Sequence, residues 1–181
     1  MCHYITAVLP PGTNLPAAQS IAEPYGRRLE LLENPGIQSQ LREGELYCLT
    51  TAGRCDCGTS LGLVGKKRPL HQVNKAKRRA ALGWSKAKIE RAIEQAARSS
   101  ESSAKQVEME AAADTENWIE FIAAIHAAGI PYIGLMLHFY ETPLSQIIQL
   151  VGRVTVHSGA QAREVLPLLA EDTIYKFRTE T

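Results

Sequence analysis

Several features that mark familiar classes of protein are missing from this sequence. No apolar run approaches the ~20 residues that a transmembrane helix needs, so the sequence contains no candidate membrane span. Charge of one sign is not in excess either. The formal net charge is +1, and the chain as a whole is therefore not an obvious polyanion-binding protein. No internal repeat, low-complexity segment or complete cofactor motif is present.

A secretory signal is also missing at the N-terminus. The segment MCHYITAVLPPG has no basic region before its apolar residues, and Pro10 and Pro11 interrupt the apolar run. We therefore expect a cytoplasmic protein with no membrane partner. The sequence has only four cysteines, and in the cytoplasm they stay reduced, which favours thiol chemistry or metal binding over a disulfide framework.

The composition that is present is typical of a soluble globular protein. Of 181 residues, 45% are hydrophobic and 22% are charged, which is enough for a hydrophobic core without disulfide bonds. This length predicts one domain over residues 1–181. Its middle is rich in charged, helical patterns, and we interpret residues 70–129 as a helical insertion in that domain.

The hydrophobic periodicity predicts six strands and several helices. The predicted strands are residues 3–9, 27–32, 46–51, 132–140, 153–157 and 173–178. One short helix is predicted after Asn14, and further helices are predicted over residues 74–82, 85–97, 104–128 and 160–169. Residues 144–151 also have helical spacing, but their β-branched residues oppose it. The segment YIGLMLHFY, residues 132–140, is apolar on both faces and predicts a central strand.

The order of these elements predicts the fold class. Strand, helix, strand, strand, helices, strand is typical of the split βαβ sheet of ferredoxin-like proteins. We therefore predict an α+β fold, with a ferredoxin-like sheet, an enlarged helical crossover and a C-terminal extension.

A cysteine- and glycine-rich segment, ELYCLTTAGRCDCGTSLGLVG, follows the third predicted strand. It contains three of the four cysteines, and the fourth opens the first strand next to a histidine. Four thiolates, or three thiolates and a histidine, suit tetrahedral zinc, which is the only cofactor that the residues indicate. The candidate ligands are Cys2, His3, Cys48, Cys55 and Cys57. The spacing C-x6-C-x-C lacks a paired C-x2-C motif, so we favour four reduced cysteines with no cofactor, and zinc binding is the alternative.

Two other sites can be built on the same segment. A nucleophilic cysteine, Cys57 or Cys2, would need a histidine within hydrogen-bond reach, and His138 and His3 are the candidates. Alternatively, the glycines could form an anion-binding loop beside Lys66, Lys67 and Arg68, although the P-loop pattern is incomplete there.

The most basic part of the sequence lies between Gly65 and Arg91, where ten Lys or Arg residues accompany one acid, Glu90. Two helical patterns there indicate a basic hairpin, which either pairs with the acidic helix that follows or binds a partner. The candidate anion- or partner-binding residues in this segment are Lys66, Lys67, Arg68, Lys75, Lys77, Arg78, Arg79, Lys86 and Lys88.

Three functions follow from these patterns. The leading hypothesis is a non-enzymatic protein of the immunity, antitoxin or adaptor type that binds a protein partner through the charged helical surface. The alternatives are a zinc-binding or cysteine-dependent site at Cys48, Cys55 and Cys57, and nucleic-acid binding through the basic hairpin. The sequence does not indicate an oligomeric state.

Overall fold

The computed structural model describes residues 2–62, 109, 111–140, 144, 147–157 and 159–179. The chain divides into two units, residues 1–64 with 113–181 and residues 65–112, and the account below concerns the first. The basic hairpin, with every candidate from Lys66 to Lys88, lies outside the described residues. Its predicted partner-binding role, and the prediction of one domain with an insertion over 70–129, therefore stay predictions.

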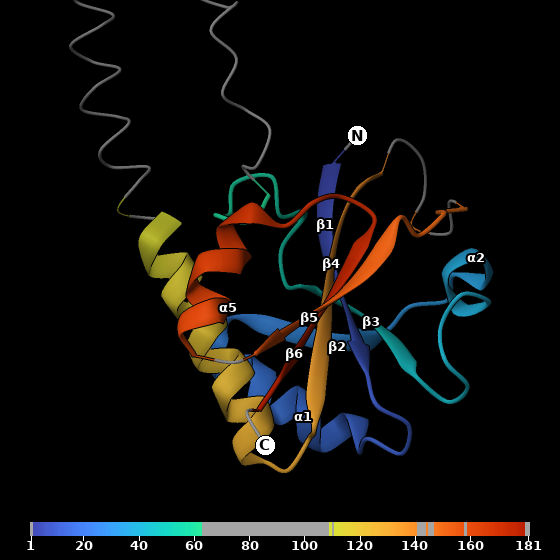
Figure 1. The fold of residues 1–181 in the computed structure, drawn as a ribbon, viewed down its shortest axis with the longest axis horizontal. Helices are drawn as coiled ribbons and strands as arrows, with labels where there is room; N and C mark the ends of the chain where they lie inside the picture. The colour runs from blue at the N-terminus through green and yellow to red at the C-terminus, as the bar shows by residue number, and fades with distance from the viewer. Residues whose placement is uncertain are drawn as a thin grey trace, which may run out of the picture. The chain divides into compact units, whose positions relative to one another are not determined.

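Six strands form one open sheet in the order β2-β3-β1-β4-β6-β5 (Figure 1). They are β1 (Cys2–Leu9), β2 (Arg27–Leu31), β3 (Leu46–Thr51), β4 (Tyr132–Tyr140), β5 (Gly152–His157) and β6 (Thr173–Arg178). Neighbouring strands are antiparallel except β5 and β6, which are parallel. The predicted α+β class is confirmed. The strand order is not that of a simple split βαβ sheet, because β6 and β5 extend it beyond β4.

Four helices accompany the sheet in the part of the chain that the structure describes. They are α1 (Leu15–Ala22), α2 (Pro35–Gln38), a helix over residues 111–127, and α5 (Ala160–Val165), with 3-10 turns η1 (Glu23–Tyr25) and η2 (Leu166–Leu168). Asn14 caps α1 as expected, because its side chain accepts a hydrogen bond from Ala17 N at 3.2 Å. None of the helices described is long and apolar enough to cross a membrane.

The sheet has a hydrophobic core on each face. In Figure 1, α1, α5 and the helix over 111–127 lie on one side of the sheet and α2 on the other. β4 lies between β1 and β6, as its sequence predicts. Ile133, Leu135 and Leu137 are buried in the larger core, whereas Phe139, near the end of the strand, is half-buried.

Two local predictions were wrong. The sequence Asn34-Pro35-Gly36 has the composition of a turn, but Asn34 instead caps helix α2, because its side chain accepts a hydrogen bond from Ile37 N at 3.0 Å. Residues 147–151 are not helical. Their main chain is held by Gln40, whose side chain donates to Ile148 O at 2.8 Å and accepts from Leu150 N at 2.9 Å.

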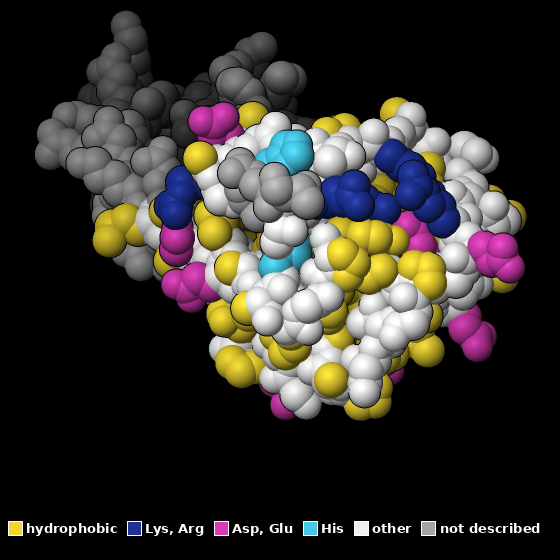
Figure 2. Space-filling view, turned by 60° about the horizontal axis from the view of Figure 1, so that its bottom comes forward, with side chains coloured by type: hydrophobic (Ala, Val, Ile, Leu, Met, Phe, Trp, Pro, Cys, Tyr) yellow, Lys and Arg dark blue, Asp and Glu magenta, His cyan; other side chains and the backbone are white. Residues whose placement is uncertain are grey.

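The same extended segment exposes apolar side chains. Ile148 is buried in the smaller core, but Ile147 and Val151 on either side of it are exposed. Figure 2 shows one face of the protein, on which hydrophobic side chains lie among Lys and Arg side chains.

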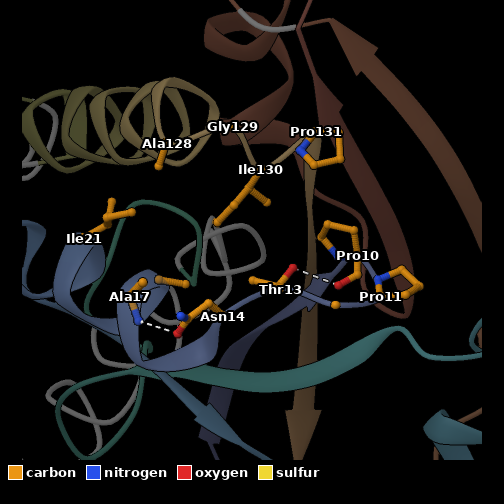
Figure 3. Close-up of a pocket in the computed structure, with 12 residues that line it drawn as sticks. Pro10, Pro11, Thr13, Asn14, Ala17, Ile21, Ala128, Gly129, Ile130 and Pro131 are labelled. Carbon is orange, nitrogen blue, oxygen red and sulfur yellow. Dashed lines mark hydrogen bonds between the residues drawn. The ribbon is translucent and has the colours of Figure 1, made fainter.

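A pocket of about 310 Å³ lies at the C-terminal end of β1 (Figure 3). It is lined by uncharged residues of the Pro10–Ala18 turn and helix start, by Ile21, and by residues 128–131. Its polar groups serve local structure, because Thr13 Oγ1 donates to Pro10 O at 2.7 Å and Asn14 caps α1.

A buried carboxylate joins β3 to the C-terminal half of the sheet. The Glu45 side chain is fully buried and accepts hydrogen bonds from Tyr132 Oη at 2.7 Å and Lys176 Nζ at 3.2 Å. Arg153 Nη1 lies 3.5 Å from it, and Arg42 N donates at 3.0 Å. Burial alone would raise the pKa of Glu45, but the hydrogen bonds from Tyr132, Arg42 and Lys176 outweigh it and lower that pKa.

This shift predicts how stability depends on pH. A carboxyl whose pKa is lower in the folded state stabilises the fold above its unfolded pKa of ~4.3, and that contribution is lost as the pH falls through the folded pKa. Burial also lowers the pKa of Lys176, which reduces the net gain from the pair. Glu45→Gln should lower the free energy of unfolding by about 1–3 kcal/mol at pH 7. It should also make that free energy depend less steeply on pH below pH 5. Urea melts at several pH values measure both, and parallel curves for the two proteins would contradict this role.

Candidate metal centre

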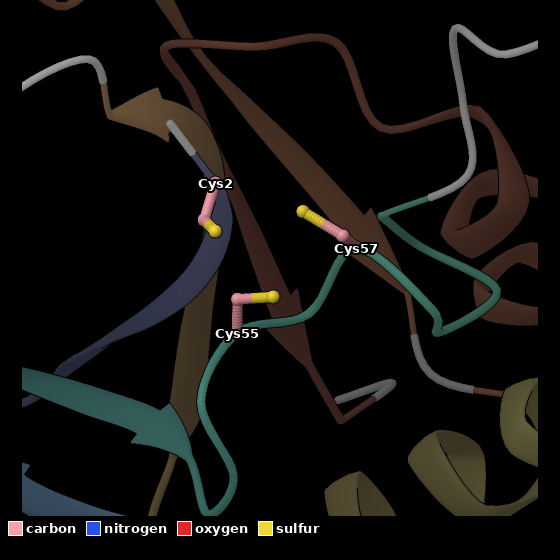
Figure 4. A group of neighbouring side chains, drawn as sticks. All are labelled: Cys2, Cys55 and Cys57. Atoms are coloured by element: carbon pink, nitrogen blue, oxygen red, sulfur yellow. The ribbon is translucent and has the colours of Figure 1, made fainter.

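Three cysteines meet at the N-terminal end of β1. Cys2 lies on β1, whereas Cys55 and Cys57 lie in the loop that follows β3, and each residue is half-buried. Their three Sγ atoms all lie within 4.8 Å of one another. Figure 4 shows the three side chains pointing toward a common space from the strand and the loop.

The loop lies there because β3 ends too early to cover all of β1. The register between β3 and β1 runs from Leu46 opposite Leu9 to Leu49 opposite Thr6, which leaves the first residues of β1 without a strand on that side. Buried main-chain donors and acceptors need partners. The loop supplies them: Asp56 N donates to His3 O at 2.8 Å, and Cys57 Sγ accepts from His3 N at 3.1 Å.

Asp56, between the two loop cysteines, holds the loop against the sheet. Its buried carboxylate accepts hydrogen bonds from Ile5 N at 2.8 Å and from Thr51 Oγ1, and Arg27 Nη1 lies 3.9 Å away. Burial raises the pKa of Asp56, and the Thr51, Ile5 and Arg27 interactions oppose that rise. These three residues engage the Asp56 carboxylate, and its negative charge still acts to raise the pKa of the neighbouring Cys55 thiol.

Arg27 connects the loop to the helix over residues 111–127. Its buried guanidinium forms an ion pair with Asp114 and lies 4.0 Å from the centre of the Trp118 ring. Asp114 also accepts hydrogen bonds from Ser60, at 2.9 Å from the main-chain N and 2.7 Å from Oγ. The loop is therefore fixed on both sides of Cys55 and Cys57, by β1 and by this ion-pair network.

The main chain also favours negative charge on Cys55. A hydrogen bond from the Cys57 backbone lowers the pKa of Cys55 below that of an ordinary thiol. The hydrogen bond between Cys2 and Cys55 raises the pKa of Cys2, and burial adds to that rise. Cys55 is therefore the first of these two thiols to become a thiolate, which is the form that binds metals.

Cys48, a candidate ligand in the sequence, lies elsewhere. It is fully buried on β3, opposite Ala7 and Leu31, and packs in the larger core. Burial raises the pKa of its thiol to about 12, so Cys48 is protonated at neutral pH. Its environment is that of a small hydrophobic residue, and the group of converging sulfurs does not include it.

The two candidate histidines each pair with an acid that sequence reasoning missed. His3 Nε2 lies 2.9 Å from Glu171 Oε1, and His138 Nδ1 is bonded to Asp172 Oδ1. The other ring nitrogen of each histidine is buried and has no hydrogen-bond partner. Neither imidazole is therefore hydrogen-bonded to a thiol, as activation of a nucleophilic cysteine would require. Glu171 and Asp172 precede β6, where no motif marks them.

Comparisons with known proteins add no assignment. No family model matches the chain, and no curated protein or solved structure matches it. A proposal about function therefore depends on the geometry of the three cysteines.

Proposed function

We propose that the protein binds one thiophilic metal ion, with Zn²⁺ as the first candidate, through Cys2, Cys55 and Cys57. The observation that carries this proposal is the convergence of three Sγ atoms within 4.8 Å. Sulfurs that share a tetrahedral zinc ion at ~2.3 Å are about 3.8 Å apart, so small side-chain adjustments are sufficient.

The surroundings of the sulfurs support thiolate ligation. The amides of His3 and Cys57 act as donors to Cys57 Sγ and Cys55 respectively, and such donors orient thiolate ligands and moderate their charge. Thiolate ligands select Zn²⁺ and Cu⁺ over Mg²⁺ and Ca²⁺. Because the ligands come from a strand and from a separate loop, metal would bind the folded chain more tightly than the unfolded one and stabilise the fold.

The fold that carries this site is proposed to be an extended ferredoxin-like sheet. In support, β1 lies between β3 and β4 with β2 beyond β3, and all three pairs are antiparallel. α1 connects β1 to β2, and the helix over 111–127 precedes β4. In this interpretation β5 and β6 are the C-terminal extension.

Zinc titration of the reduced protein against a chromophoric chelator tests the function. We expect one Zn²⁺ per chain, a higher melting temperature with the metal, and reversal of both by a strong chelator. Cys57→Ser should weaken zinc binding by at least about 100-fold, because it removes a ligand rather than an outer-shell partner, whose loss costs about 10–100-fold.

Cys48→Ala is the matched control, because it also removes one thiol but leaves the three converging sulfurs in place. It should lower stability and keep the zinc stoichiometry. A wild-type protein that takes up no stoichiometric Zn²⁺, Cd²⁺ or Co²⁺ under reducing conditions, and melts at the same temperature with or without them, would overturn the proposal.

A further inference from the structure

Three thiolates leave one position of a tetrahedral metal site to be filled, and His3 is the histidine nearest to the cluster along the chain. It follows Cys2 on β1. Its main-chain N donates to Cys57 Sγ at 3.1 Å, and its carbonyl accepts from Asp56 N at 2.8 Å. The His3 backbone is thus in direct contact with the loop that carries the other two cysteines.

Only one of the two ring nitrogens of His3 has a hydrogen-bond partner. Its Nε2 lies 2.9 Å from Glu171 Oε1, whereas its Nδ1 is buried and has no hydrogen-bond partner. An ionised carboxylate accepts hydrogen bonds and does not donate them, so the neutral ring carries its proton on Nε2. The lone pair is then on Nδ1, a buried acceptor that nothing satisfies, and such groups call for an explanation.

Metal-binding histidines have this arrangement. The ring nitrogen that does not bind the metal usually donates to a carboxylate, which fixes the tautomer and the ring orientation and makes the ligand more basic. We propose that His3 Nδ1 is the fourth ligand of the ion held by Cys2, Cys55 and Cys57, and that Glu171 is its positioning residue. This inference rests on the proposed function and specifies it as a closed Cys₃His site for a tetrahedral divalent ion.

The ring must move to reach the ion. Its nitrogens are not among the atoms that lie within 4.8 Å of one another, and the ring packs against Phe139 with 4.9 Å between centroids. Cys2 and His3 are consecutive on β1, so their side chains leave the strand on opposite faces. The His3 ring would therefore have to turn around the edge of β1, where its main-chain N already contacts Cys57 Sγ, to bring Nδ1 to the sulfurs. Glu171 can follow this movement, because half of its side chain is exposed.

X-ray absorption of the zinc-loaded wild-type chain tests the ligand directly. We expect three sulfurs and one nitrogen, with the outer-shell scattering of an imidazole ring. His3→Ala should remove the imidazole signal, keep the three sulfurs and lower zinc affinity by about 10–100-fold. His157→Ala is the control, because His157 is an exposed histidine on β5, and it should change neither signal nor affinity.

Glu171→Gln tests whether Glu171 positions the His3 imidazole without being a metal ligand itself. It should keep the imidazole signal and the melting temperature of the metal-free protein, yet weaken zinc binding by about 10–100-fold, as the loss of an outer-shell carboxylate does. A role in folding alone would move the melting temperature instead.

The outcomes distinguish the two proposals. Zinc bound by three sulfurs without imidazole scattering, with affinity unchanged in His3→Ala, would overturn the role of His3 and leave the thiolate site standing with water as its fourth ligand. Failure of the wild-type chain to bind zinc, cadmium or cobalt would overturn both. Because the absorption measurement needs no variant, the inference stays testable even if His3→Ala does not fold.

Discussion

Arg27→Ala will lower the free energy of unfolding by about 3–5 kcal/mol, because removing one partner of a buried ion pair leaves the other charge uncompensated. The Arg27 side chain is 7% exposed, and its guanidinium lies between two carboxylates, those of Asp56 and Asp114. It also covers the face of the buried Trp118 ring at 4.0 Å. Alanine would leave both carboxylates facing a cavity, next to an aromatic ring that has lost its contact.

The neighbouring residue provides the control for this variant. Arg28 pairs with Glu30 at 3.1 Å, but the Arg28 side chain is 37% exposed and that of Glu30 66%, and ion pairs open to solvent contribute about 0–1 kcal/mol. Arg28→Ala should therefore change stability little. Urea unfolding followed by tryptophan fluorescence and by circular dichroism measures both variants. Equal losses for Arg27→Ala and Arg28→Ala would show that the Arg27 network does not stabilise the fold.

Arg27→Ala should also affect the candidate metal site. Arg27 and Asp114 hold the loop through Asp56 and Ser60, on either side of Cys57. If the loop loosens, the three sulfurs lose their preorganised positions and metal affinity falls as well. Arg28→Ala should leave the zinc affinity unchanged.

The strands could be predicted from the sequence because their hydrophobic patterns are local. β4 is apolar on both faces, and this alone predicts a strand that is covered on both sides by other parts of the protein. The structure places β4 between β1 and β6, with a core on each face. Helix ends were predictable where a capping residue is present, as at Asn14 and α1.

The site could be predicted only in part, because convergence is a tertiary property. The sequence places Cys55 and Cys57 in a loop and Cys2 on a strand, but the early end of β3 brings them together. Cys48 could have been separated from the set, since residues two apart on a strand share a face, and Cys48 follows the core pattern of β3. Glu171 reaches His3 only through the pairing of β6 with β4, for which no local pattern exists.

The conformation of a segment that one distant side chain holds in place was the hardest feature to predict. Residues 147–151 have apolar residues at helical spacing. However, Gln40, which lies about 110 positions earlier in the chain, forms hydrogen bonds with the main-chain O of Ile148 and N of Leu150. A long-range polar contact of this kind overrides a local helical preference.

Leu135→Ala will produce the second large loss of stability, about 2–5 kcal/mol, as expected for a buried leucine that is truncated in a well-packed core. Leu135 is fully buried on β4, opposite Ala7 of β1 and Tyr175 of β6. The backbone on both sides is hydrogen-bonded to neighbouring strands, so the sheet cannot collapse to fill the cavity. Urea melts at constant pH measure the loss.

Leu31→Ala is the matched control for this core position. Leu31 is also a leucine on a strand, but it lies on the edge strand β2 with 58% of its surface exposed. Its truncation should change stability by less than about 0.5 kcal/mol, as exposed substitutions usually do. The difference between the two variants then measures burial in the central strand rather than the intrinsic preference of leucine for a strand. A loss below about 1 kcal/mol for Leu135→Ala, well under the usual ~2–5 kcal/mol for such core truncations, would mean that β4 is not the centre of the core.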